Sequence, residues 1–192
     1  MKRLLLAAVM SVVGLANAAP VSGFNGDYAV ANWTQSAGTG AINTAGAPNS
    51  ISLTSGDDGS FEMSYTNFYI QFAVDTTVTF SWAYSTLDLS PFYDPFGYVL
   101  SGTDSPLDLV DGFAQLYPDL DAPSPSGATS VFVQAGQYFG FSTSSDNLGG
   151  SATTTIRGFT IDDGTIPEPS SLLLLALALA AVGTVTRQRR AV

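Results

Sequence analysis

The sequence predicts an all-β fold: an antiparallel β-sandwich of jelly-roll type, with one apolar helix at each end of the chain. Three observations carry this prediction. Residues 24–161 are rich in Ser, Thr, Gly, Asn, Val and aromatic residues and show no helical period. Several runs in this region alternate apolar and polar residues, as half-buried strands do. Turn-forming Gly, Pro, Asn and Asp separate these runs.

The first 18 residues have the three parts of a secretory signal peptide. Lys2 and Arg3 form the positive start, Leu4–Leu15 the apolar core, and Ala16-Asn17-Ala18 a small-x-small cleavage site for signal peptidase. This apolar core is too short to span a bilayer, so a removable signal helix fits better than an anchor. We therefore expect the mature chain to begin at Ala19.

The clearest strand is Thr77–Tyr84, because its residues alternate between two faces. Trp82 and Tyr84 share the apolar face with Val78 and Phe80, which predicts a core role for them. Further strands are predicted at Phe61–Tyr65, Phe68–Val74, Phe96–Leu100, Phe113–Leu116, Ser130–Gln134, Tyr138–Ser142 and Thr153–Ile161.

The connections follow from turn residues. Asp57-Asp58-Gly59 predicts a turn, and Ala135-Gly136, between two predicted strands, predicts a tight hairpin. The prolines of residues 116–126 indicate a long crossing loop, and residues 145–151 a shorter one. Short strands at this spacing, without an internal repeat, predict one domain over residues 19–165.

Residues 166–192 form a tail of three parts. Pro167-Glu168-Pro169 precedes the apolar block Leu172–Val185, and the basic residues Arg187, Arg189 and Arg190 follow it. The block has no polar face, which argues against the amphipathic helix of a small core. As a helix, residues 170–186 would span roughly 25 Å, the lower limit for a bilayer core. The arginines keep their end of a membrane helix in the cytoplasm, so a single transmembrane helix is predicted over about residues 170–186.

The order of these three parts resembles the PEP-CTERM sorting signal of Gram-negative bacteria. In that family exosortase, a membrane protease-transpeptidase, recognises the tail, and processing occurs near the tripeptide. The resemblance implies transient anchoring in the inner membrane, followed by transfer to the cell envelope, the outer surface or the extracellular matrix of a biofilm. Such proteins occur in species that make extracellular polysaccharide. If the tail stays intact, it is instead an ordinary membrane anchor.

Two internal segments carry a second resemblance. Tyr93–Gly102 and Val133–Phe141 are similar to segments of PEP-CTERM ectodomains. This resemblance implies a β-sandwich and carries no activity with it.

Composition excludes several classes of function. All sixteen acidic residues lie between Ala19 and Pro169, where Arg157 is the one basic residue. So acidic a region disfavours binding to nucleic acid and to anionic membranes. The chain has no Cys and no His, which excludes disulfides, zinc-thiolate sites, Ser-His-Asp triads and imidazole bases. Its single Lys lies in the signal peptide, which removes Schiff-base and Ser-Lys mechanisms.

Two kinds of binding site are compatible with the exported residues. Calcium takes six to eight oxygen ligands, and Asp94 with Asp146 and Asn147 is the first candidate set. Asp and Asn also favour solvated turns, so the same residues have a purely structural explanation. Tyr93, in a proline-flanked segment, is a candidate for stacking on a sugar ring.

These observations favour an exported, acidic, non-enzymatic protein of the cell envelope or extracellular matrix. A carbohydrate- or calcium-binding module is the first alternative, with extracellular polysaccharide as its candidate partner. A glycoside hydrolase is the second, because two carboxylates such as Asp88 and Asp94 suffice for that reaction. No cofactor is expected beyond the calcium ion of the first alternative.

Overall fold

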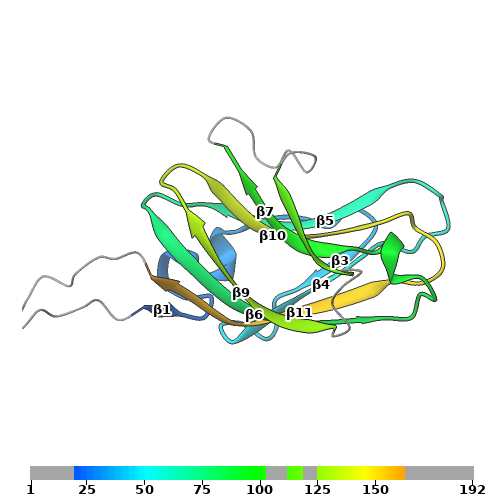
Figure 1. The fold of residues 1–192 in the computed structure, drawn as a ribbon, viewed down its shortest axis with the longest axis horizontal. Helices are drawn as coiled ribbons and strands as arrows, with labels where there is room; N and C mark the ends of the chain where they lie inside the picture. The colour runs from blue at the N-terminus through cyan, green and yellow to red at the C-terminus, as the bar shows by residue number, and fades with distance from the viewer. Residues whose placement is uncertain (1–19, 103–111, 119–124, 163–192) are drawn as a thin grey trace, which may run out of the picture. The chain divides into compact units, whose positions relative to one another are not determined.

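The computed structural model describes residues 20–102, 112–118 and 125–162, and their regular elements are strands and three short 3-10 helices (Figure 1). All of them belong to one compact unit, Ala19–Asp163. In chain order the elements are β1 Val21–Ser22, η1 Gly26–Tyr28, η2 Val30–Asn32, β2 Thr34–Ser36, β3 Ala41–Asn43, β4 Ser50–Thr54, β5 Ser64–Gln71, β6 Thr76–Thr86, η3 Pro91–Tyr93, β7 Phe96–Ser101, β8 Phe113–Tyr117, β9 Ser126–Val133, β10 Tyr138–Ser145 and β11 Ala152–Asp162.

The strands form two antiparallel sheets. The first has the order β3-β4-β11-β6-β9, with β1 also paired to β11, and the second has the order β2-β5-β10-β7-β8. The long strands β6 and β11 are paired along most of their length, from Ala152 opposite Thr86 to Asp162 opposite Thr77. The prediction of an all-β antiparallel fold is confirmed, and its jelly-roll type stays a prediction.

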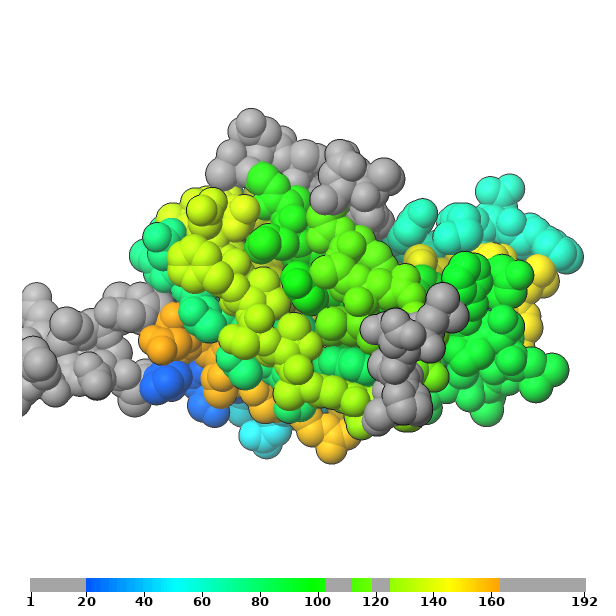
Figure 2. Space-filling view, viewed as in Figure 1, coloured from blue at the N-terminus to red at the C-terminus, as the bar shows by residue number. Residues whose placement is uncertain are grey.

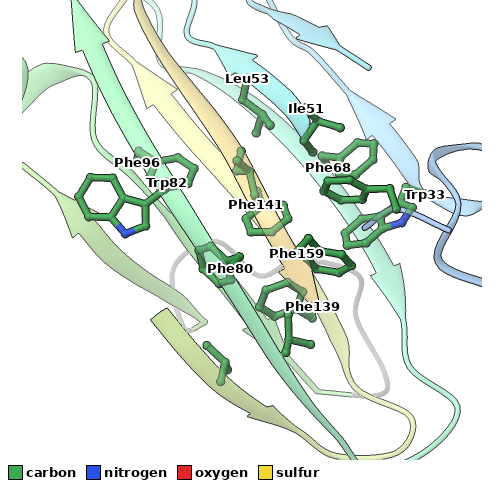
Figure 3. Packing of buried hydrophobic residues seen from close by; sticks show 14 of the residues in the cluster. Trp33, Ile51, Leu53, Phe68, Phe80, Trp82, Phe96, Phe139, Phe141 and Phe159 are labelled. Carbon is green, nitrogen blue, oxygen red and sulfur yellow. The ribbon is translucent and has the colours of Figure 1, made fainter. Parts of the chain in front are cut away.

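The core lies between the two sheets because the strands alternate as their sequences predict. Along β6 every second residue from Thr76 to Tyr84 is buried, and Phe80 of β6 meets Phe141 of β10 edge to face at 4.9 Å. Figure 3 shows these rings pointing toward one another from facing strands. Burial of large apolar side chains contributes roughly 25 cal/mol per Å² of surface removed from water.

Aromatic rings dominate this core. Trp33 stacks on Phe68 at 4.5 Å, and Phe24 stacks on Phe159 at the same distance. Trp33 is 5% exposed and its indole N–H donates to the carbonyl of Tyr28. Both tryptophans are therefore structural, as predicted for Trp82 from its strand face.

Two local predictions differ from the structure. One continuous strand, β5, replaces the two predicted strands Phe61–Tyr65 and Phe68–Val74. It begins only at Ser64, because Phe61 has a positive φ of 64° that no extended strand accommodates. Ala135-Gly136 does form a turn, but it does not close a hairpin. It joins β9 of the first sheet to β10 of the second, so the two strands beside it belong to different sheets.

The predicted helices fall outside the described residues. The signal peptide covers residues 1–18 and the tail covers residues 166–192, so both stay predictions as structural elements. Within residues 20–162 that the structure describes, no helix is long and apolar enough to cross a membrane.

Candidate functional site

Three connections meet at one end of the sandwich, which we call the loop end: residues 55–63, 87–95 and 146–151. Each joins a strand of one sheet to a strand of the other. The N–H of Gly59 donates to the carbonyl of Asn147 at 3.0 Å, and the N–H of Leu87 donates to the carbonyl of Ser151 at 3.4 Å. Residues 146–151 therefore lie between the other two loops, at the right-hand end of Figure 1.

The side chain of Asn147 bonds the 146–151 loop to neighbouring segments of the loop end. Its side-chain amide donates to the carbonyl of Glu62 at 2.7 Å and to the Ser60 hydroxyl at 3.3 Å. Its Oδ1 accepts from the hydroxyl of Thr39 at 2.7 Å. The residue is buried and has a positive φ of 60°, a conformation that Asn tolerates better than most residues. A Cβ on Gly56 would collide with Oδ1 of Asn147, so the neighbouring backbone packs directly on this side chain.

The carboxyl group of Asp94 is buried near Asn147. The residue follows η3, is 0% exposed, and its Oδ1 accepts from the hydroxyl of Ser55 at 2.8 Å. Its Oδ2 is buried without a hydrogen-bond partner among the described residues. Burial raises the pKa of Asp94; the hydrogen bond from Ser55 opposes the shift, and the charge of Asp88 reinforces it. The site therefore disfavours the charged form of this carboxyl relative to an Asp in water.

The phenol of Tyr84 also bonds to Asp94, through its main chain. Its hydroxyl donates to the main-chain carbonyl of Asp94 at 3.0 Å. Burial, followed by the nearby Asp94 charge, raises the pKa of Tyr84 well above its usual range, so the phenol stays neutral. Tyr84 is thus a hydrogen-bond donor in the core, consistent with its predicted place on the apolar face of its strand.

The calcium candidates are brought to the same end of the molecule. Asp146 lies close enough to Asp94 for its charge to raise that residue's pKa. Its own Oδ1 accepts from the N–H of Leu148 at 3.1 Å, and the side chain of Asn147 already bonds to protein groups on both of its ends. Among residues 20–162 that are described, no three acidic side chains are placed to hold one metal ion.

The sugar-stacking candidate, Tyr93, lies in η3 at the loop end and is half exposed. Phe92 beside it is more exposed, and the two rings meet edge to face at 5.5 Å. Their ring planes are 86° apart, so they do not form one flat platform. Phe61, across the 146–151 loop, is 75% exposed.

The two carboxylates of the hydrolase alternative have different surroundings. Asp88 is near the surface, where its Oδ1 accepts from the N–H of Ser90 at 2.7 Å. Asp94 is completely buried, so a substrate has no access to its free oxygen in this arrangement. A glycosidase needs both carboxyl groups at the scissile bond, which this geometry does not provide.

Other predicted site residues lie outside the described part of the chain. They are the signal-peptidase site Ala16, Ala18 and Ala19, the tripeptide Pro167, Glu168 and Pro169, and the basic cluster Arg187, Arg189 and Arg190. Sequence reasoning missed Phe61, Leu87, Leu89 and Phe92. Leu87 and Leu89 flank an Asp just before a proline-bounded turn, a pattern that could have marked them as loop residues.

Comparison with solved structures gives distant likenesses. The K3 cleaved adhesin domain of Lys-gingipain from Porphyromonas gingivalis W83 is 11% identical, with a TM-score of 0.42, covering 76% of this chain and 98% of that one. The K1 cleaved adhesin domain of the same protein is 12% identical, also at 0.42, covering 77% and 100%. The MgGH51 α-L-arabinofuranosidase is 14% identical at 0.37, covering 77% of this chain and 26% of that one. At such TM-scores the likeness says nothing about function.

No curated protein matches the chain. A family comparison identifies the tail instead: residues 165–190 match the PEP-CTERM protein-sorting motif. The match includes the tripeptide, the apolar block and the three arginines. The chain therefore carries a PEP-CTERM protein-sorting motif, the signal of an exported protein that exosortase sorts.

Proposed function

We propose that the chain is a non-enzymatic protein of the outer surface or extracellular matrix of a Gram-negative bacterium. The observation that carries this proposal is the sorting motif at residues 165–190. Signal peptidase would cut after Ala18, and exosortase would then process the tail near Pro167-Glu168-Pro169 while the apolar block lies in the inner membrane. Arg187, Arg189 and Arg190 would stay on the cytoplasmic side.

The chemistry of the exported region supports a role without catalysis. It has no His, Cys or Lys, so an enzyme built on it would depend on carboxylates and hydroxyls. The carboxyl with the most perturbed surroundings, Asp94, is sealed in the domain and bonded to Ser55. A buried, hydrogen-bonded carboxyl of this kind has a structural role and is not accessible to a substrate. The loops around it can still form a binding surface.

A carbohydrate- or calcium-binding module remains the second candidate. The exposed rings of Phe92 and Tyr93 favour sugar stacking, and the nearness of Asp146 to Asp94 favours a cation. Glycan-array binding that Tyr93→Ala abolishes, or a calcium-dependent rise in melting temperature that Asp146→Asn abolishes, would establish this candidate. Hydrolysis of a polysaccharide that Asp88→Asn abolishes would overturn the non-enzymatic role.

Mass spectrometry of the protein recovered from the cell surface or medium tests the sorting step. We expect a chain that begins at Ala19 and lacks the segment from Leu172 onward. The same protein from a strain without exosortase should keep the whole tail. An intact tail in both strains would make residues 170–186 an ordinary anchor and refute the proposed route.

A further inference from the structure

Large apolar side chains gather at the loop end. Nine of them are exposed among the described residues, and six of the nine belong to this end: Phe61, Met63, Leu87, Leu89, Phe92 and Tyr93. Leu87 is 86% exposed and Leu89 is 101% exposed, so neither contributes to the core. Scattered apolar residues on a surface are ordinary, whereas a group confined to one end of a domain marks an interaction site.

The six side chains lie on two loops with a third between them. Phe61 and Met63 belong to the 55–63 loop, and the other four belong to the 87–95 loop. Figure 2 shows the two loops, in cyan and green, at one end of the molecule, with the yellow 146–151 loop between them. The exposed apolar groups thus flank a shared surface at which a partner could contact both loops.

The structure holds Phe61 in place for such a contact. Its positive φ of 64° is strained for a bulky residue and persists only where the surroundings impose it. Asn147 supplies this constraint, because its amide bonds to both neighbours of Phe61, Ser60 and Glu62. A hydrogen bond from the N–H of Ser60 to Asp58 adds to it. The ring is therefore presented to solvent by a fixed backbone.

The loop end is also the most acidic part of the described domain. Eight acidic side chains in the described ranges are exposed or half-buried, and five of them lie there: Asp57, Asp58, Glu62, Asp88 and Asp146. Hydrogen bonds from the hydroxyl and then the N–H of Ser60 lower the pKa of Asp58, which keeps it ionised. The only basic residue between positions 4 and 186, Arg157, is in the middle of β11, opposite Ser50 and Ser81.

The charge discriminates among the partners that an apolar surface could accept. A second copy would bring an equally acidic end, and the two would repel each other. Phosphates of anionic lipids or of nucleic acid are repelled in the same way. A polypeptide with basic residues around an apolar side chain satisfies both features: the carboxylates attract its charges, and the exposed rings and leucines pack on its apolar group.

The strand register places this surface at the opposite end of the domain from Asp162. Ala152, at the loop end, pairs with Thr86, and Asp162, the last described residue before the tail, pairs with Thr77. At about 3.4 Å per residue, β11 separates the two ends by about 34 Å. The loop end is therefore remote from the last described residue, through which the chain continues to the sorting motif.

We propose that the loop end is a docking surface for a basic polypeptide that presents an apolar side chain between Lys or Arg residues. Phe61, Leu87, Leu89 and Phe92 are its apolar anchors. Asp57, Glu62 and Asp88 supply the charge that attracts and orients the partner.

A random peptide library displayed on phage tests this proposal, because it samples many basic and apolar sequences at once. The bait is the protein recovered from the cell surface or medium, and its mass is measured first, so that a failure of sorting is seen separately from a failure of binding. We expect selected peptides to be net positive and to contain an aromatic residue or Leu. Binding of a representative peptide, followed by fluorescence anisotropy, should weaken as salt is raised.

Matched variants identify the surface. Leu89→Ser with Phe92→Ser should weaken peptide binding at least tenfold, and Asp57→Asn with Glu62→Gln should weaken it and flatten its salt dependence. The controls carry the same substitutions away from the loop end: Phe132→Ser on β9 and Asp27→Asn in η1 should leave binding unchanged. All of these side chains are exposed, so melting temperatures should confirm that the variants fold.

Several outcomes would overturn the proposal. They are selection of no peptides, selection of neutral or acidic ones, or equal binding by Leu89→Ser with Phe92→Ser and by the unsubstituted protein. Binding to phosphatidylcholine vesicles that this double variant loses would assign the surface to lipid. A dimer in sedimentation that the same variant dissolves would assign it to a second copy of the chain.

Discussion

Replacement of Asn147 by Ala tests whether one buried side chain holds the loop end together. The substitution removes the hydrogen bonds to Glu62 and Thr39, both 2.7 Å long, and the longer one to Ser60. Two good hydrogen bonds contribute about 1 kcal/mol each to the free energy of unfolding. Ala at a φ of 60° costs about 1 kcal/mol more, because its Cβ meets the following carbonyl without the local hydrogen bonding of Asn. The expected loss is about 3 kcal/mol.

Urea unfolding and thermal melting measure this loss. For a domain of this size, 3 kcal/mol corresponds to a fall in melting temperature of about 10 °C. Asn147→Gly separates the two contributions, since Gly adopts a positive φ freely and loses only the hydrogen bonds, about 2 kcal/mol. Asn49→Ala is the matched control: that side chain is exposed, and the change should stay within about 0.5 kcal/mol.

The loop itself provides a second measurement. Without the Asn147 side chain, Ser60 and Glu62 lose their hydrogen bonds to it, so limited proteolysis should cut near Phe61 faster in Asn147→Ala than in the control. If Asn147→Ala is as stable as Asn49→Ala, the hydrogen bonds of Asn147 do not hold the loop. If Ala and Gly at this position are equally destabilising, the positive φ carries no cost.

Three further predictions concern the buried groups. Because the pKa of folded Asp94 is raised above its unfolded value of about 3.9, its protonated form stabilises the fold below that pH, and this contribution is lost as pH rises through the folded pKa. In Asp94→Asn the free energy of unfolding should no longer show this fall with pH, as urea unfolding at several pH values would measure. The same pH dependence in the variant and the native protein would contradict a raised pKa for Asp94. Gly140→Ala should lower the free energy of unfolding by more than about 1 kcal/mol, as measured by urea unfolding, because its Cβ would lie 2.7 Å from the carbonyl oxygen of Phe68. Unchanged stability would mean that the neighbouring strands move apart at no cost. Phe159→Ala should cost about 3–5 kcal/mol, against less than about 1 kcal/mol for the exposed Phe132→Ala; equal losses would remove the ring stack on Phe24 from the core.

Most of the fold could be predicted from the sequence, because strand patterning is local. The alternation in Thr77–Tyr84 depends on the two-residue period of a strand, and β6 buries the predicted face. The short strands β1, β2, β3 and β4 escaped prediction, because two to five residues hold too little of a period to stand out. The false hairpin at Ala135-Gly136 has another cause: a turn sequence defines a change of direction and does not say which sheet receives the next strand.

The candidate site could be predicted only in part. Asp94, Asp146 and Asn147 lie at one end of the domain, and their role as calcium ligands stays a prediction. Their environments could not be predicted, since burial of Asp94 depends on Ser55 and Tyr84, which reach it from two other strand ends. The exposure of Phe61 was missed for the same reason, because the residue that holds its loop lies far along the chain, at position 147.

By itself the sequence determined the fold class of this protein and its sorting motif. The sorting motif and the predicted signal peptide are contiguous segments, and the physical properties on which they depend, charge and apolar length, are properties of the chain before it folds. Tertiary structure decided the rest. Pairing of β6 with β11 and packing of the two sheets bring the 55–63, 87–95 and 146–151 loops together. This arrangement buries Asp94 and raises its pKa, lets the side chain of Asn147 bond to the 55–63 loop, and leaves Phe61 exposed.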